Sequence, residues 1–242
     1  DAVDYEAFLR ERELLEQLRK SVADGFRGFE LFFQPIVRVG QDVPFMAESL
    51  LRFKTTDGEM VSPVEFIPIL EESGLIIPVG KWLIDRALSM CAECQKTQPE
   101  FHISVNLSYV QILKSDVCEE IEHWIEFYNL KPESLMVELT ESGYVDDNSP
   151  AVKRLWDRLR EYGVMIALDD FGTGYSNFQL ISSMVPNIVK LDRSFTVKAL
   201  QNIFEHQLMD HIIQLVHSVN LKICVEGVET KAELEEIEKL SA

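Results

Sequence analysis

The sequence predicts an α/β protein, a TIM-like (β/α) barrel with an antiparallel first strand, from three observations. The chain has 242 residues, close to the roughly 250 that a single β/α barrel uses. Short apolar runs alternate with amphipathic stretches, the pattern of parallel strands joined by helical crossovers. Polar and acidic residues recur where these runs end, and barrel enzymes carry their active sites at the carboxyl ends of the strands. The near-equal units favour a closed barrel over an open doubly wound sheet.

Seven apolar runs have the character of strands. The first two are separated only by Arg38–Pro44, which is too short for a helical crossover, so we expect them to pair antiparallel. A closed barrel needs one more strand, and we expect this last strand to be missing from the chain. The predicted strands are Leu31–Val37, Phe45–Phe53, His102–Leu107, Leu135–Leu139, Met165–Asp169, Ile188–Leu191 and Lys222–Val225.

Helices are expected before and between these strands. Tyr5–Val22 carries apolar residues at helical spacing among many charges, and the chain opens without an initiator methionine. We therefore expect residues 1–25 to form a linker helix from a preceding domain and residues 26–242 to form the barrel domain. The other predicted helices are Pro63–Glu72, Gly80–Lys96, Tyr109–Tyr128, Ser149–Tyr162, Tyr175–Met184, Ser194–Val219 and Lys231–Leu240.

The charge balance is strongly acidic. The 41 acidic and 23 basic residues give a formal net charge of −18, which argues against binding to a nucleic-acid polymer because phosphate backbones are repelled. A phosphate ligand would need local cations, and divalent metal ions held by carboxylates supply them. Most of the acidic excess is expected to be a solvated surface.

Membrane and cysteine signals are weak. No apolar run approaches the roughly 20 residues of a membrane span, and no signal peptide is visible. Cys91 and Cys94 have CxxC spacing within a predicted helix, but no second Cys/His pair lies nearby, so core packing is favoured over zinc or redox chemistry.

The strand-end residues form the candidate site. A single carboxylate after a strand is ordinarily a helix N-cap or a turn residue, and a lone lysine among acids can simply balance charge. Several such residues converging on one barrel mouth favour a functional site instead. They are Asn106, Glu138, Asp169, Asp170, Lys190 and Glu226.

Oxygen ligands without histidine or cysteine favour hard cations such as Mg²⁺ or Mn²⁺. Two such ions can bridge a phosphate and activate water. Lys190 among acids stays protonated and can stabilise negative charge that develops on a phosphoryl group. The segment Asp169–Ser176 adds two adjacent acids, two glycines for a tight turn and a serine that can cap the next helix.

Eight short motifs follow one another along the chain and cover nearly everything from Phe29 onward. They are Gln34–Val37, Glu48–Arg52, Phe66–Pro68, Asn106–Ser108, Glu138–Ser142, Asp169–Ser176, Lys190–Phe195 and Glu226–Thr230. In this order they resemble the EAL-domain family of cyclic-di-GMP phosphodiesterases, and the shared order makes a chance match a weak explanation.

This resemblance implies that the domain hydrolyses cyclic-di-GMP to linear pGpG at a metal site. It also implies roles for individual residues. Glu48, Asn106, Glu138 and Asp169 would ligate a first ion, and Asp170 would hold a second. The catalytic set would be Lys190, which orients water or the scissile phosphate, Glu226 as ligand or general base, Glu48 and Asp170. Substrate contacts would come from Gln34, Leu50, Arg52 and Asp192, with Glu141 and Glu229 in support.

Two departures from the family pattern stand out. Glu48-Ser49-Leu50 replaces Glu-Ala-Leu, and Ser49 is expected to face away from Glu48 without loss of activity. The family also continues into a last strand with a Gln-Gly motif, which lies beyond Ala242.

Rival functions remain open. The alternative is a catalytically inactive EAL domain that acts as a cyclic-di-GMP receptor or protein-interaction module, and a barrel enzyme for another phosphate ester is a third reading. Intact metal-ligand positions favour the active enzyme. The resemblance also implies a homodimer, and we expect an upstream signalling domain. The lack of a visible membrane span or signal peptide predicts a cytoplasmic location for this domain, while the full-length protein could be membrane-anchored.

Overall fold

The computed structural model describes residues 2–140, 150–172, 181 and 184–240. They divide into two compact units. Unit 1 is the chain up to Pro35 together with Met46–Leu135, and unit 2 is Ile36–Phe45 together with the chain from Met136 onward. Each unit carries some of the predicted site residues, and each unit is described separately.

The strands of unit 1 are arranged around β2, Pro44–Lys54. β4, His102–Asn106, runs parallel to β2, and β3, Met60–Val61, pairs antiparallel with its end. β1, Phe29–Val37, neighbours β2 on the sheet. The backbone N–H of Lys54 donates to the carbonyl of Gly28 at 2.9 Å, which joins the end of β2 to the start of β1. The prediction of an antiparallel first pair is therefore confirmed.

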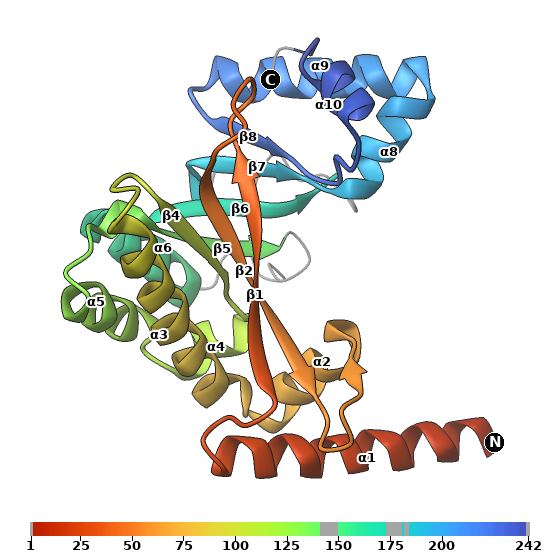
Figure 1. Ribbon diagram of the computed structural model, residues 1–242, viewed down its shortest axis with the longest axis vertical. Helices are drawn as coiled ribbons and strands as arrows, with labels where there is room; N and C mark the ends of the chain where they lie inside the picture. The colour runs from red at the N-terminus through yellow and green to blue at the C-terminus, as the bar shows by residue number, and fades with distance from the viewer. Residues whose placement is uncertain (1, 141–149, 173–180, 182–183, 241–242) are drawn as a thin grey trace. The chain divides into compact units, whose positions relative to one another are not determined.

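Helices α2 (Pro63–Ser73), α3 (Ile76–Gln95), α4 (Tyr109–Lys114) and α5 (Val117–Phe127) follow in unit 1, with a short 3₁₀ turn, η1, at Pro132–Ser134. Helix α3 packs against α4, α5 and strand β4 (Figure 1). The prediction of one helix over Tyr109–Tyr128 is wrong. The Asp116 side chain accepts a hydrogen bond from the Glu119 N–H at 3.0 Å and caps a second helix there, because a short carboxylate competes well for free N–H groups.

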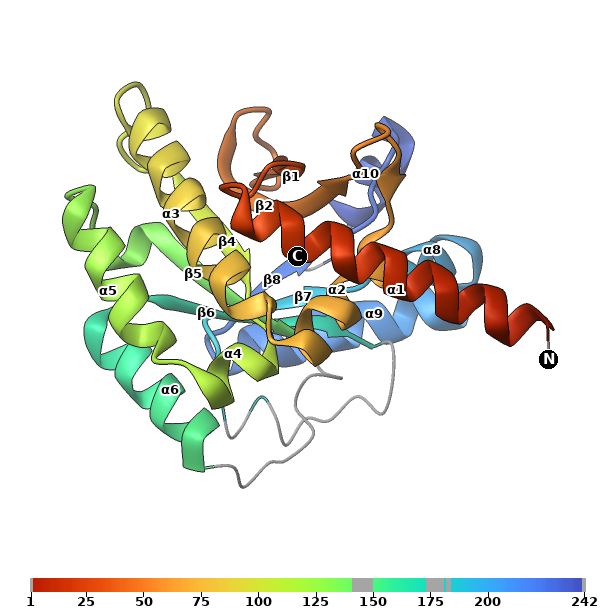
Figure 2. The same cartoon turned by 90° about the horizontal axis from the view of Figure 1, so that it is seen from below.

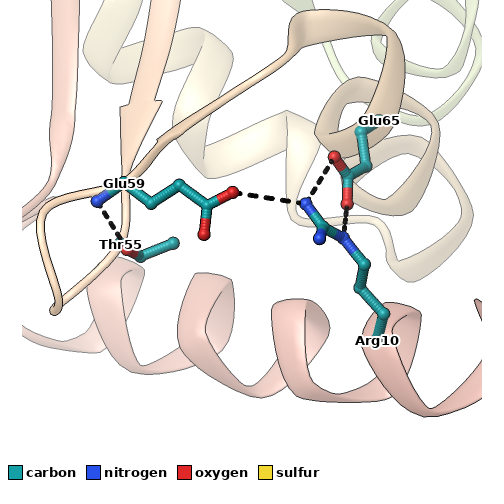
Figure 3. Close-up of polar contacts among 4 residues, drawn as sticks. All are labelled: Arg10, Thr55, Glu59 and Glu65. Atoms are coloured by element: carbon teal, nitrogen blue, oxygen red, sulfur yellow. Dashed lines mark hydrogen bonds and ion pairs between the residues drawn. The ribbon is translucent and has the colours of Figure 1, made fainter. Parts of the chain in front are cut away.

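Helix α1, Ala2–Ala23, packs on α2 through one face (Figure 2). Leu14 and Leu18 on this face are buried. Arg10 forms ion pairs with Glu65 of α2 and Glu59 of the turn between β2 and β3 (Figure 3). The predicted N-terminal helix is thus present, and its polar anchor is Arg10.

Unit 2 is a parallel sheet. β5 (Leu135–Thr140), β6 (Met165–Phe171), β7 (Ile188–Leu191) and β8 (Lys222–Val225) pair in that order, each parallel to the next. All seven predicted strands are confirmed across the two units, with bounds that shift by at most two residues. The sequence analysis missed β3, because two residues carry no periodic signal.

Helices α6 (Pro150–Tyr162), α8 (Arg193–Gln201), α9 (Ile203–Ser218) and α10 (Lys231–Ile237) belong to unit 2. The prediction of one helix over Ser194–Val219 is wrong, because the Asn202 side chain accepts from the Phe204 N–H at 2.8 Å and starts a new helix. Most of the predicted helix Tyr175–Met184 lies outside the described residues. Among the described residues, no helix is both long and apolar enough to cross a membrane.

Candidate active site

Lys190 is the centre of a buried charge cluster in unit 2. Its side chain lies on β7 and is only 1% exposed. The ammonium nitrogen Nζ lies 2.7 Å from Glu138 Oε2, 3.2 Å from Asp169 Oδ1 and 2.8 Å from Glu226 Oε1. Three of the predicted strand-end carboxylates therefore meet one lysine.

Parallel pairing brings these four residues together. Their strands are consecutive in the sheet, and the register places Glu138 opposite Ala167, two residues before Asp169. Lys190 lies opposite Cys224, two residues before Glu226. The carboxyl ends of parallel strands share one edge, so residues at the end of each strand converge.

Asp169 and Asp170 lie in an irregular part of β6. The register between β6 and β7 shifts between Leu168 and Phe171, as in a β-bulge. Asp170 has φ +56°, a left-handed conformation that is uncommon outside glycine. Asp169 is buried whereas Asp170 is half-exposed. Bulges commonly re-aim side chains near active sites, and this one gives two adjacent acids different surroundings.

The charges of this cluster suit a divalent cation. Three carboxylates face one ammonium group, so the acids exceed the cations by two when all are ionised. Carboxylate oxygens of Glu138 and Asp169 lie within 4.8 Å of each other. Buried carboxylates need a compensating charge, and hard oxygen donors are the ligands that Mg²⁺ and Mn²⁺ prefer. The donor set of unit 2 therefore fits a divalent metal ion.

Unit 1 carries a second pair of predicted ligands. Glu48 on β2 is opposite Ser104 on β4, so Asn106 lies two residues further along the neighbouring strand. The Asn106 amide donates from Nδ2 to Glu48 Oε1 at 2.9 Å. This bond orients the amide and leaves its carbonyl oxygen Oδ1 as an acceptor for a cation.

The predicted substrate residues of unit 1 lie on the neighbouring strands β1 and β2. Gln34 on β1 is exposed, and Leu50 and Arg52 on β2 are half-buried. Arg52 Nη1 donates to the Leu51 carbonyl at 2.9 Å, and its guanidinium carbon lies 5.5 Å from the centroid of the Phe32 ring. The sequence analysis missed Phe32, although its two-residue spacing from Gln34 places both on one face of the strand.

The predicted residues after β7 and β8 are held by local bonds. Asp192 Oδ1 accepts from the Ser194 N–H at 2.7 Å and caps α8. Glu229 lies 2.6 Å from Arg193 in an exposed ion pair. Its backbone N–H also donates to Glu233 Oε2 at 2.8 Å. Backbone donors of this kind lower the pKa of Glu233, and they fix the turn that follows Glu226.

Gly227 is required in that turn for two reasons. Its φ is +77°, and a Cβ atom there would lie 2.3 Å from Arg193 Cγ. Real Cβ atoms do not approach other carbons so closely. The backbone beside Glu226 is therefore pressed against the start of α8, which limits where the Glu226 carboxylate can point.

The remaining predicted features are structural or lie elsewhere. Ser49 is buried, and its hydroxyl has no hydrogen-bond partner within the described ranges. Cys91 is a buried free thiol, and burial raises its pKa to about 12, which agrees with core packing rather than redox chemistry. Glu141 and residues 173–176 lie outside the described residues.

Comparison with known proteins gives a consistent family match. The EAL-domain family model matches residues 15–242. The signaling protein YkoW of Bacillus subtilis is 34% identical over 205 residues, which cover 85% of this chain and 26% of YkoW. The bifunctional diguanylate cyclase/cyclic di-GMP phosphodiesterase MucR of Pseudomonas aeruginosa is 31% identical over 94% of this chain and 33% of its own length. The probable cyclic di-GMP phosphodiesterase PdeG of Escherichia coli is 32% identical over 91% of this chain and 43% of its own length.

The chain thus spans less than half the length of these relatives. Among solved structures, the EAL enzyme Bd1971 in its cAMP-bound form has a TM-score of 0.87 and 31% identity over 99% of this chain and 66% of its own. The MucR phosphodiesterase in complex with c-di-GMP has a TM-score of 0.85 and 30% identity over 95% of this chain and 92% of its own. These likenesses confirm the predicted TIM-like (β/α) fold class.

Proposed function

The chain belongs to the EAL-domain family, and on that basis we propose that it is a metal-dependent phosphodiesterase that opens cyclic-di-GMP to linear pGpG. The observation that carries the proposal is the buried ammonium of Lys190 among three strand-end carboxylates. The similarity to PdeG, a probable cyclic di-GMP phosphodiesterase, and to MucR, which combines this activity with a diguanylate cyclase, supports the same substrate.

The proposed metal ligands follow the motifs that this chain shares with the family. We assign Glu48, Asn106, Glu138 and Asp169 as ligands of a first Mg²⁺ or Mn²⁺ ion and Asp170 as the holder of a second. The excess of carboxylates over cations around Lys190 supports this assignment for unit 2, and the Glu48–Asn106 hydrogen bond supports it for unit 1. When bound, such ions polarise the phosphate and make water easier to deprotonate.

The protein groups then have distinct tasks in the hydrolysis. Glu226, which is partly exposed, accepts the proton of the attacking water. The water oxygen forms a bond to phosphorus, the bond from phosphorus to the 3′ oxygen breaks, and the leaving oxygen takes up a proton. Lys190 stabilises the negative charge that grows on the phosphoryl oxygens, because an ammonium is most effective in a buried site.

Substrate binding would fall to residues around the metal ligands. Arg52 would pair with a phosphate, and Gln34 and Leu50 would contact the dinucleotide. Asp192 would contribute Oδ2, since its Oδ1 already accepts from Ser194. Arginine suits the task because its planar donors match phosphate oxygens.

The longer protein would add regulation. We infer that α1 joins this domain to a preceding signalling domain, because the family match starts at residue 15, within that helix. The match to much longer relatives supports this inference. We further propose that the domain is cytoplasmic and that it acts as a homodimer. Glu141 and Glu229 would support the site.

A product assay tests the proposed function. The purified protein is incubated with cyclic-di-GMP and Mg²⁺ or Mn²⁺, and products are separated by chromatography. Accumulation of pGpG is expected from the wild type and from Glu72→Gln, which changes an exposed carboxylate of α2. Glu48→Gln should abolish the product without loss of fold. Tight binding of cyclic-di-GMP without any pGpG would identify a receptor instead.

A further inference from the structure

Arg52 is one of three arginines that lie over an aromatic ring among the described residues; the other two are Arg12 and Arg38. Arg52 is the one that shares its strand face with Glu48. Arg10 and Arg193 pair with carboxylates, whereas Arg52 has no carboxylate partner in the part of the chain that the structure describes. Its contacts within the described ranges are the Leu51 carbonyl and the ring of Phe32. One Nη atom is used and the other donors stay available, which is the arrangement expected of a guanidinium that receives an external anion.

Phe32 differs from Phe29 on the same strand in its exposure to solvent. Phe29 on the same strand is buried and packs against Phe53 and Trp82, with ring centroids 4.9 and 6.2 Å away. Phe32 points to the opposite face of β1 and is 49% exposed. Its aromatic surface therefore contributes little to the core, and within the described ranges the ring lies against the guanidinium of Arg52.

The two residues form a small platform on the face that carries Glu48. Residues of β2 alternate between faces, so Arg52 shares its face with Leu50 and Glu48. Phe32 meets Arg52 from the neighbouring strand β1, and Gln34 follows two residues later on the same side. An aromatic face attracts a cation and restricts where it moves. A long side chain loses considerable rotamer freedom when it binds a ligand. The ring of Phe32 already restricts the Arg52 side chain before the ligand arrives, so less rotamer freedom is lost on binding.

We propose that Phe32 is a positioning residue, which holds the Arg52 guanidinium in place so that its free N–H donors meet a phosphate of the cyclic dinucleotide. This inference rests on the proposed function. The ring acts on substrate affinity through Arg52 and does not touch the reacting atoms. The expected signature is thus a higher KM with nearly unchanged kcat.

A double-mutant cycle tests the inference. Phe32→Leu keeps the apolar bulk and removes the aromatic face, Phe32→Tyr keeps the face, and Arg52→Ala removes the guanidinium. Phe33→Leu is the matched control, because Phe33 lies next in the strand and on its other face. KM and kcat are measured for pGpG formation, and cyclic-di-GMP affinity is measured by calorimetry with Ca²⁺ in place of Mg²⁺. The Arg52 ¹⁵Nε–¹Hε resonance reports whether the aromatic ring still lies over the guanidinium.

The expected result is a KM that is about two- to fivefold higher for Phe32→Leu, a shifted Arg52 resonance, and recovery of both in Phe32→Tyr. In the Arg52→Ala background, Phe32→Leu should have no further effect. An unchanged KM and resonance in Phe32→Leu would overturn the inference. So would an effect of the same size without Arg52, because the ring would then contact the ligand directly.

A failure of the proposed function would give results different from those of a failure of the proposed role of Phe32. A wild-type protein that forms no pGpG refutes the hydrolase, and the calorimetric cycle and the Arg52 resonance then still decide the role of Phe32. A wild-type protein that forms pGpG while Phe32→Leu matches it in every readout refutes the role of Phe32 alone.

Discussion

Lys190 Nζ lies 2.7 Å from Glu138 Oε2, and neither side chain is more than 1% exposed. Taking both charges out of water costs several kcal/mol per ion, so such a pair is a poor way to stabilise a fold. Strand ends of a parallel sheet are where active sites are built. The pair is better explained as part of a site that must hold charge away from bulk water.

Lys190→Met should reduce pGpG formation by about 100-fold or more. It should also destabilise the protein by about 3–5 kcal/mol, because Glu138 loses a buried partner. Chemical denaturation and a product assay measure the two effects. The double variant Glu138→Gln/Lys190→Met should regain stability but no activity. An active Lys190→Met protein would contradict the role of the ammonium.

Asp170 combines a charge with a left-handed backbone. Asp170→Asn keeps a residue that tolerates this conformation, so stability should hold while activity and affinity for a second ion fall. Asp170→Ala should in addition lose about 1–2 kcal/mol of unfolding free energy. Metal titration and denaturation separate these effects. Equal stability of the two variants would mean that the backbone strain is absent in solution.

Gly227→Ala should displace Glu226, because the added Cβ meets Arg193 at 2.3 Å. Gly74→Ala is a matched control, since Gly74 has φ +75° with no atom within 4 Å of the added Cβ. Both changes should cost about 1 kcal/mol for the backbone. Only Gly227→Ala should lose further stability and hydrolysis. Equal activity of the two variants would show that the position of Glu226 is not critical.

Ser49→Ala should leave hydrolysis unchanged and raise the unfolding free energy by about 1 kcal/mol, because it removes a buried hydroxyl that has no hydrogen-bond partner among the described residues. Ser49 alternates with Glu48 along β2 and so faces the other side. Thermal denaturation and initial rates check this expectation. A large drop in rate would mean that the hydroxyl contributes to the site.

The strands of this chain can be recognised in the sequence because buried parallel strands are nearly continuous apolar runs. Leu135–Thr140 and Ile188–Leu191 are such runs, and the polar residues near their ends, Glu138 and Lys190, stand out in the sequence. The sequence thus predicted a cluster of strand-end residues with Lys190 among acids, but not which carboxylates contact the lysine. Helix breaks were less visible, since the caps at Asp116 and Asn202 interrupt an otherwise unbroken helical period.

Other features depend on tertiary contacts that no local pattern encodes. The bulge that separates Asp169 from Asp170 follows from the pairing of β6 with β7. The contact of Phe32 with Arg52 joins two strands, and an exposed phenylalanine in an apolar run looks like any core residue. Gly227 could be recognised as a turn glycine, but its contact with Arg193 could not.

The most direct test of the central claim is a ³¹P NMR time course of cyclic-di-GMP with the protein and Mg²⁺ or Mn²⁺. Cyclic-di-GMP holds two phosphodiesters, whereas linear pGpG carries a terminal phosphomonoester with a distinct resonance. We predict that this resonance grows with the ion present, stops when the ion is chelated, and never appears with Glu138→Gln. If cyclic-di-GMP binds but its spectrum keeps only phosphodiester signals, this would contradict the proposal that the protein hydrolyses it.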